Sequence, residues 1–299
     1  MRYVFFNEFE PGVLQDGTVY SLAGLLAEVG AHTPQEVLEY LITNEALLRP
    51  SIKEVIATAA GHEVASVRLR PPVPRPQSLV CAFANYYEDG ARKEVPLDMF
   101  LKSSASIIGP GDTVVLPPVE ASIFHHEAEL AFVIGKRASR VSAADAMGYI
   151  FGYVPFMDIS ARGTGGRTMF QGKSYDTFGP IGPAIVTADE VIDPHNLQMQ
   201  LSVNGELRQN YNTSDMANRI PQLIEYATAV MTLEPGDVIA TGTNHQGLGP
   251  VQDGDTVELA IEGLGTLMVK VTDERKRTWA REIDKGMAQM VAGMGGNRS

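Results

Sequence analysis

The residues most able to do chemistry in this chain are two glutamates separated by one alanine, within the segment HHEAELAFVIG at residues 125–135. Alternate residues of a β-strand point to opposite faces, so an extended segment places Glu127 and Glu129 side by side. Two carboxylates held this close repel each other unless a metal ion, a base or a shared proton lies between them. Hard divalent cations prefer oxygen ligands, so the pair points to Mg²⁺ or Mn²⁺, with Ca²⁺ as a further candidate.

Asp158 is the candidate third ligand. It follows the apolar run YIFGYVPFM, which we expect to be a strand of the same sheet. The pattern alone leaves a second interpretation open, because Glu127 and Glu129 also fit the solvated face of an edge strand. Lys173 lies in the glycine-flanked segment GKSYDTFGP, a type of loop that can approach an anion. Without that context, Lys173 fits a solvated surface lysine better.

The elements that must position these residues are mainly β-strands. From residue 79 onward, short apolar runs alternate with turns rich in Gly, Pro and Asp, interrupted by a short helix beginning at Ser142 and a longer one at 220–233. We therefore expect an α+β fold that is mainly β, in which the flanking helices are a minority.

The N-terminal region has a different pattern of apolar residues, which predicts helices as well as strands. Residues 3–20 predict a hairpin with a turn at Asp16–Gly17, and three amphipathic segments at 22–30, 34–48 and 51–61 predict helices. Thr33 and Ser51 are the expected N-caps of the second and third helices. Four prolines between residues 71 and 76 then form a stiff connector. We place a domain boundary there, with an N-terminal hairpin plus helices over 1–72 and the catalytic domain over 73–299.

Composition excludes several classes of protein. The chain has 299 residues and one cysteine, so it is not a disulfide-stapled miniprotein, and we expect Cys81 to be an inert core residue. A net charge of −12 disfavours a nucleic-acid partner. No apolar stretch approaches the roughly 20 residues of a membrane helix, and Glu8 and Glu10 interrupt the N-terminus where a signal peptide is apolar. These features predict no membrane partner and a cytoplasmic location.

Several ordered blocks make the chain resemble the fumarylacetoacetate hydrolase (FAH) superfamily. The resemblance begins near residue 71 and rests on PVPRPQSLVCAFANYYED, FLKSSASIIGPGDTVVLP, EAELAFVIGKRASRVSAADA, GYVPFMDISARG, GKSYDTFGPIGPAIVT, VNGELRQNYNTSDM and LEPGDVIATGT. It implies a β-rich roll with flanking helices, a homodimer, and Mg²⁺- or Mn²⁺-dependent chemistry on small anionic 1,3-dicarbonyl acids.

The resemblance also implies roles for individual residues. It assigns Glu127, Glu129 and Asp158 as the metal ligands. It implies substrate contacts from a set of polar side chains: Tyr86, Arg162, Lys173, Thr241 and Thr243. The expected catalytic residues are Lys173 and Arg162, joined by three candidates for the acid–base group: His125, His245 and Asp89.

This chain departs from the family pattern at two positions. Many members carry N-Y-x-x-H, whose lid histidine activates water, whereas Asn85-Tyr86-Tyr87-Glu88-Asp89 has an aspartate in that place. The second departure is His125-His126, which precedes the two glutamates. Strand alternation predicts that His125 shares their face and lines the metal pocket, while His126 points to the core. His245 supplies a further imidazole close to the TGT segment, and Glu88 is an alternative base to Asp89.

The resulting prediction is a metal-dependent hydrolase, with a place in aromatic catabolism, that cleaves a C–C bond in an acylpyruvate-like acid. Loss of the lid histidine leaves two alternatives open, a β-keto acid decarboxylase and a hydroxydienoate isomerase or tautomerase, because neither needs a nucleophilic water. A hypothesis of another class is a non-catalytic binding protein with a degenerate site.

Overall fold

Two β-sheets pack face to face in the larger part of the molecule, and the strands of the smaller sheet alternate buried apolar residues with outward-facing ones. The computed structural model describes residues 1–88, 96–166 and 168–294. Strand β19 shows the pattern: Val257, Leu259 and Ile261 are buried, whereas Glu258 is exposed. The described part of the chain is mainly β with four α-helices, which confirms the expected fold class.

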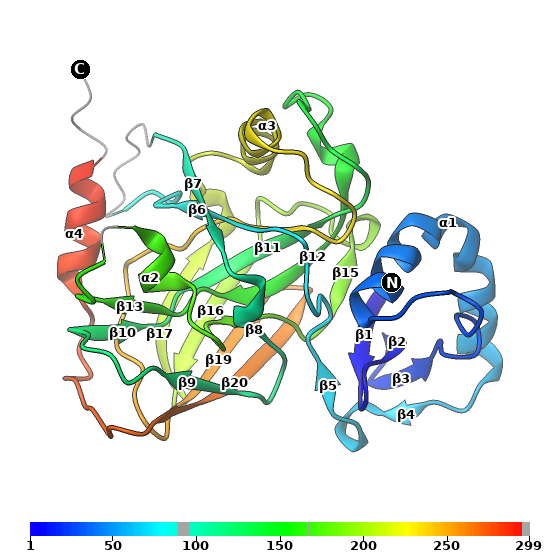
Figure 1. Cartoon of the computed structure of the whole chain (residues 1–299), viewed down its shortest axis with the longest axis horizontal. Helices are drawn as coiled ribbons and strands as arrows, with labels where there is room; N and C mark the ends of the chain where they lie inside the picture. The colour runs from blue at the N-terminus through cyan, green and yellow to red at the C-terminus, as the bar shows by residue number, and fades with distance from the viewer. Residues whose placement is uncertain (89–95, 167, 295–299) are drawn as a thin grey trace.

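The larger sheet has eleven strands and extends from the N-terminal strands β1–β4 into the larger part of the molecule (Figure 1). Its spatial order is β4 (His62–Glu63), β3 (Thr18–Ser21), β2 (Glu10–Gln15), β1 (Arg2–Phe6), β15 (Ile185–Thr187), β12 (Ile150–Met157), β11 (Ala128–Ile134), β18 (Val238–Ala240), β6 (Leu79–Phe83) and β7 (Asp98–Lys102), with β5 (Leu69–Arg70) beside β1.

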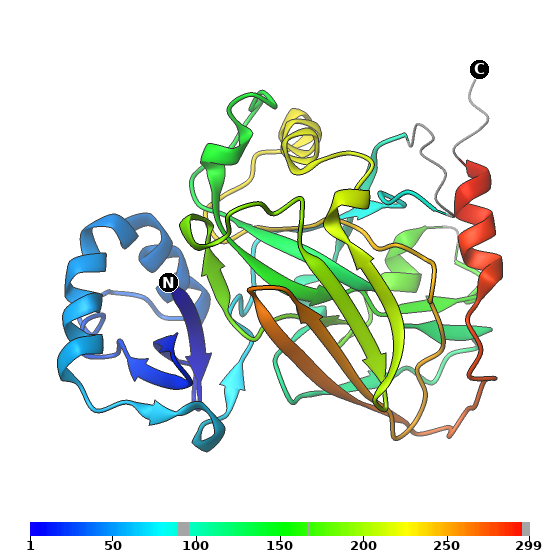
Figure 2. The same cartoon turned by 180° about the vertical axis from the view of Figure 1, so that it is seen from behind.

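The second sheet has five strands and lies in front of the first in Figure 2. Its order is β17 (Glu206–Asn212), β16 (Gln198–Val203), β19 (Thr256–Ile261), β20 (Gly265–Asp273) and β9 (Thr113–Leu116). Two short pairs complete the β-structure: β10 (Ile123–His125) with β13 (Ser160–Arg162), and β8 (Ile107–Ile108) with β14 (Gly179–Pro180).

The helices lie at the periphery. They are α1 (Pro34–Thr58), α2 (Met169–Lys173), α3 (Ile220–Val230) and α4 (Lys285–Met294), with short 3₁₀ turns at 64–66, 104–106, 146–149, 188–190 and 213–215. The longer helix expected at 220–233 is α3, whereas the short one expected from Ser142 is reduced to the turn at 146–149. None of the described helices is both long and apolar enough to cross a membrane.

The N-terminal helices differ from the sequence prediction. Residues 23–28 form turns, and the two later segments merge into the single helix α1, so Ser51 is inside the helix and caps nothing. Pro50 lies within α1, where a proline costs a backbone hydrogen bond. The helix continues through it because Leu38, Leu41, Ile42 and Ile52 all pack into one apolar core. The expected capping box of Thr33 and Glu36 is present.

Both faces of the larger sheet are buried. Leu130, Phe132 and Ile134 of β11 pack toward the second sheet, while Ala131 and Val133 pack toward α1 and β1. Strand β1 pairs with β15, which joins the N-terminal strands to the rest of the sheet. Glu129 therefore shares a face with Ala131 and Val133, on a strand fixed from both sides.

Candidate active site

Two neighbouring strand ends bring the three acidic residues together. Strands β11 and β12 run antiparallel with Ala128 opposite Met157, so the start of one lies beside the end of the other. The amide of Asp158 donates to the carbonyl of Glu127 at 3.0 Å, which extends the pairing by one step. As a result, carboxylate oxygens of Glu127, Glu129 and Asp158 lie within 4.8 Å of one another, and all three side chains are buried.

The carboxylate of Glu129 is held by a backbone amide. The amide of Gly242 donates to Glu129 Oε2 at 2.8 Å. Gly242 has a φ of +85°, and a Cβ at this position would lie 3.1 Å from the carbonyl oxygen of Ala82, so glycine suits this close approach. Glu129 Oε1 has no hydrogen-bond partner among the described residues, which leaves it free to face a ligand.

Three cations neutralise the acidic cluster. Lys173 Nζ lies 2.7 Å from Glu127 Oε2 and 2.6 Å from Asp158 Oδ2. Arg162, on β13, pairs with Glu127 Oε1, which also accepts from the hydroxyl of Ser160 at 2.9 Å. Lys102, at the end of β7, lies 2.7 Å from Asp158 Oδ1 and is buried. Such contacts satisfy buried charges that would otherwise be costly.

The surroundings of Glu127 and Glu129 shift the pKa values of the two side chains in opposite directions. Burial raises the pKa of Glu127, but Lys173 and Arg162 outweigh this effect and hold that pKa well below its usual value. Burial, reinforced by the charges of Asp158 and Glu127, raises the pKa of Glu129 well above its usual value. Burial alone would lower the pKa of Lys173, but Asp158 and Glu127 raise it, so this lysine stays an ammonium. The neighbouring cations therefore compensate the negative charge of Glu127 but not that of Glu129.

This arrangement fits a divalent metal ion. The donors are carboxylate oxygens, which hard cations prefer, and the free Oε1 of Glu129 lies where added positive charge is most stabilising. Glu127, Glu129 and Asp158 would hold the ion.

His245 and Glu88 form a second buried pair. His245 Nδ1 lies 2.7 Å from Glu88 Oε1, and the same oxygen accepts the backbone amide of His245 at 2.9 Å. Because Glu88 occupies Nδ1, the remaining ring nitrogen, Nε2, is the one left for a substrate or a water molecule. A histidine oriented by a carboxylate in this way is the usual arrangement of a general base.

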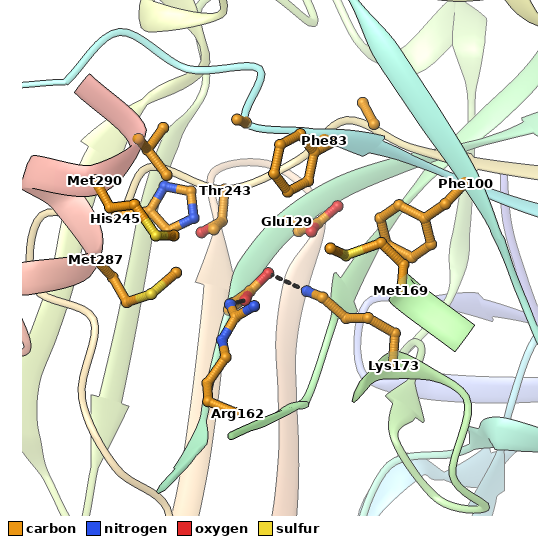
Figure 3. A pocket seen from close by; sticks show the side chains of 14 residues that line it. Phe83, Phe100, Glu129, Arg162, Met169, Lys173, Thr243, His245, Met287 and Met290 are labelled. Atoms are coloured by element: carbon orange, nitrogen blue, oxygen red, sulfur yellow. Dashed lines mark hydrogen bonds and ion pairs between the residues drawn. The ribbon is translucent and has the colours of Figure 1, made fainter. Parts of the chain in front are cut away.

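A cavity of about 140 Å³ connects the acidic cluster with His245. Its polar lining consists of Glu127, Glu129, Arg162, Lys173, Thr243 and His245. Its apolar lining consists of Ala82, Phe83, Ala84, Phe100, Met169, Met287, Met290 and Val291 (Figure 3). The site thus combines a charged floor with apolar walls.

His125 lies behind the site and does not line the cavity, in contrast to the prediction. The strand is interrupted at residues 126–127, and His125 belongs to β10, so alternation does not carry through to Glu127. His125 Nδ1 is 3.4 Å from Nε of Arg162, and Nε2 is 3.2 Å from Asp284 Oδ2 without a well-directed hydrogen bond. Burial, followed by the charge of Arg162, lowers the pKa of His125 to about 3, so the ring is neutral.

Two expected substrate contacts also lie outside the cavity lining. The hydroxyl of Thr241 donates to the carbonyl of Leu130 at 2.9 Å and lies 3.3 Å from the hydroxyl of Tyr86. Both side chains are buried, and Thr243 lines the cavity in their place. Lys173 was expected in a loop but is the last residue of α2. Asp89, expected as a catalytic residue, lies outside the described residues.

Sequence reasoning missed several residues that shape the site. Lys102 reaches Asp158 from a strand far away in the sequence. Gln209 is buried and links the segment that contains Thr243 to the start of β11. Its amide group donates to Thr243 and to the carbonyl of Asn244, and its oxygen accepts from His126 and from the amide of Ala128. The block FLKSSAS contained Lys102, but no spacing rule links it to Asp158. No pattern placed α4 at the cavity.

Comparison with known proteins places these features in a family. Residues 78–272 match the model of the fumarylacetoacetate hydrolase C-terminal domain. The chain belongs to the fumarylacetoacetate hydrolase family. It is 39% identical over 253 residues to a mitochondrial oxaloacetate tautomerase of Bos taurus, an alignment that covers 80% of each protein.

Solved structures of this family superpose on the chain over most of its length. A maleylpyruvate hydrolase from Sphingobium sp. SYK-6, solved with manganese(II) and pyruvate, is 39% identical with a TM-score of 0.84, covering 91% of this chain and 99% of that one. A 2-hydroxyhepta-2,4-diene-1,7-dioate isomerase from Mycobacterium marinum is 34% identical with a TM-score of 0.71, covering 92% and 99%. The family's relatives are therefore enzymes with tautomerase, hydrolase and isomerase activities.

Proposed function

We propose that this protein is a divalent-metal-dependent hydrolase that cleaves the C–C bond of a small acylpyruvate. The observation that carries the proposal is the His245–Glu88 pair, because His245 lines the same cavity as Glu127 and Glu129. Hydrolysis needs a base to activate water, and the sequence left that role open, because Asp89 stands where the N-Y-x-x-H pattern has its histidine. His245 fills it from a different segment.

The reaction can be followed through the chain's own residues. His245 Nε2 accepts a proton from water while the water oxygen adds to the acyl carbonyl carbon. Glu88 holds the ring and stabilises its protonated form. The bond from that carbon to the methylene carbon then breaks, and its electron pair stays with the methylene carbon as the enolate of pyruvate. His245 returns the proton there, so the products are a carboxylic acid and pyruvate.

The cations of the floor bind the anionic part of the substrate. Lys173 and Arg162 both line the cavity, and the planar guanidinium of Arg162 suits a carboxylate. A bound Mg²⁺ or Mn²⁺ would supply Lewis-acid stabilisation of the negative charge on the leaving group. The manganese(II) and pyruvate in the Sphingobium structure support this choice of metal and of leaving group.

A product analysis tests the proposal. Purified protein is incubated with Mn²⁺ and acetylpyruvate in ¹⁸O-labelled water and followed by NMR and mass spectrometry. We expect acetate and pyruvate, with one ¹⁸O in the acetate and none incorporated by bond cleavage into pyruvate. Metal-free protein should be inactive. Exchange between keto and enol forms without cleavage would contradict hydrolysis.

A tautomerase acting on oxaloacetate is the second candidate, favoured by the similarity to the Bos taurus oxaloacetate tautomerase. A base at His245 and the charged floor suffice for moving a proton between carbon and oxygen. Oxaloacetate in the same assay separates the candidates: faster keto–enol exchange supports the tautomerase, and CO₂ with pyruvate indicates a decarboxylase. A non-catalytic binding protein would be silent with every substrate while still binding Mn²⁺. A homodimeric state and a cytoplasmic location stay predictions.

A further inference from the structure

We propose that helix α4 determines which acyl group the substrate can carry. It favours substrates whose acyl group is an uncharged alkyl chain over those whose acyl group ends in a carboxylate. This inference rests on the proposed hydrolysis, because the position of His245 fixes which part of the substrate approaches α4. Its basis is the pair Met287 and Met290, which line the cavity beside His245. No role was expected for this helix from the sequence.

The cavity has two chemically different ends. Figure 3 shows Lys173, Phe100 and Met169 on one side of Glu129, and His245 with Met287 and Met290 on the other. The acidic cluster and its lysine therefore fix where the pyruvate end of the substrate binds. The base that activates water must lie next to the carbonyl under attack, so the acyl group that this carbonyl carries extends toward α4.

Helix α4 is firmly anchored at this position. Asp284 Oδ1 accepts the amides of Gly286 and Met287 at 3.0 and 3.3 Å, which caps the helix, and the amide of Asp284 donates to the carbonyl of Leu248 at 2.8 Å. The preceding segment is held by Arg281, whose guanidinium makes two contacts with the buried carboxylate of Asp255, at 2.6 and 2.8 Å. The methionines are thus presented by a fixed element.

Among the residues that the structure describes, the α4 side of the cavity offers no free positive charge. Among the described residues that line the cavity, the cations are Arg162 and Lys173, and both already contact Glu127. Lys285 is at the first position of α4 but is exposed and does not line the cavity. A carboxylate at the end of the acyl group would therefore lose part of its hydration against the thioethers without gaining a partner. An alkyl end would gain dispersion contacts with the polarisable sulfurs.

Two acylpyruvates that differ only at the acyl terminus test the proposal. Butyrylpyruvate ends in a methyl group, and succinylpyruvate has a carboxylate in its place. We expect the wild-type kcat/KM with Mn²⁺ to favour butyrylpyruvate by at least about tenfold. Met287→Lys should shift that ratio toward succinylpyruvate by at least about tenfold, because it supplies the missing cation. Met290→Lys, at a side chain that is 47% exposed, should act in the same direction without threatening the fold.

Gln289→Lys is the matched control, because it adds the same charge to an exposed position of the same helix that does not line the cavity. Its ratio should equal that of the wild type. A wild-type ratio near or below one overturns the proposal, as does a ratio that neither methionine variant moves. If the wild type cleaves neither compound, the hydrolase assignment fails, and calorimetric affinities for both compounds with Mn²⁺ then decide: a preference for butyrylpyruvate supports the role of α4, and equal, reversed or undetectable binding overturns it.

Discussion

The charged floor and the apolar walls of the cavity are built in different ways. The floor consists of Glu127, Glu129 and Asp158, which lie at the adjoining ends of β11 and β12 and are fixed by paired strands on either side. Half of the apolar wall comes from α2 and α4, and the other half comes from β6, the residue after it and β7. We infer that the carboxylates at the strand ends fix the chemistry and that the apolar wall, including α4, selects which substrate undergoes it. Changes to the floor should therefore abolish activity, and changes to the walls should redirect it.

Glu127→Gln should have the largest effect, because it removes one proposed metal ligand and a contact of both Lys173 and Arg162. We expect Mn²⁺ binding to weaken by more than about 100-fold, since losing an outer-shell partner already costs 10–100-fold. Isothermal titration calorimetry with Mn²⁺ measures this directly. The exposed Glu28→Gln serves as the control, and unchanged Mn²⁺ affinity in Glu127→Gln would show that the ion binds elsewhere.

His245→Gln tests the base rather than the metal site. We expect kcat to fall by about 10²–10⁴, the usual contribution of a general base, with Mn²⁺ affinity unchanged. Glu88→Gln should cause a smaller loss, because it acts by orienting His245 through the 2.7 Å contact. Steady-state kinetics at saturating Mn²⁺ provides the measurement, with the exposed His32→Gln as the control. Full activity in His245→Gln would show that His245 is not the base in the proposed hydrolysis.

Lys102→Met probes the support beneath the floor. Its ammonium is buried against Asp158, so without metal the variant should lose about 3–5 kcal/mol of unfolding free energy, as broken buried pairs do. Mn²⁺ should stabilise the variant more than the wild type, because the ion replaces some of the missing positive charge. Urea unfolding with and without Mn²⁺ measures both effects. The exposed Lys53→Met should stay within about 0.5 kcal/mol of the wild type. Equal stabilisation of Lys102→Met and wild type by Mn²⁺ would contradict this picture.

Asp273→Asn tests the segment that leads to α4, and its effect should be the smallest. Burial raises the pKa of Asp273, but three hydrogen bonds have a larger, opposite effect. They come from the side chain and amide of Arg277 and from the amide of Arg275, and they bring the pKa below its ordinary value of 3.8. A carboxyl whose pKa is lower in the folded state stabilises the protein above its unfolded-state pKa and loses that contribution as the pH falls toward the folded value.

The wild type should therefore exceed Asp273→Asn by about 1–3 kcal/mol of unfolding free energy at pH 7, the usual range for hydrogen bonds to a charged group. The difference should stay constant down to about pH 5 and shrink below pH 4. Urea unfolding across this range gives the curve. A difference that does not change with pH would mean that Asp273 acts through packing instead of charge.

The sequence could predict the floor better than the walls, for physical reasons. Glu127 and Glu129 lie close together as expected, although only Glu129 belongs to β11, and the apolar run before Asp158 correctly indicated the neighbouring strand β12. Periodicity failed for His125, because the strand breaks at 126–127. It also failed between the helices expected at 34–48 and 51–61, because burial of Leu41 and Ile52 on one side of α1 keeps the helix continuous through Pro50.

Contacts between distant segments were beyond any local rule. Lys102 and Asp158 are 56 residues apart, and Glu88 and His245 are 157 apart, so only the folded topology brings them together. The methionines of α4 carry no spacing that distinguishes a cavity wall from an ordinary apolar helix face. The sequence therefore predicted the three carboxylates with Arg162 and Lys173, but not Lys102 or the apolar side chains around them.

If Glu127, Glu129 and Asp158 hold one divalent ion, anomalous X-ray diffraction from crystals soaked in Mn²⁺ will locate it. We expect one strong anomalous peak with a carboxylate oxygen of each of the three residues at bonding distance, and no such peak in Glu127→Gln crystals. A cavity without a peak, or a peak that touches none of these oxygens, would contradict this expectation.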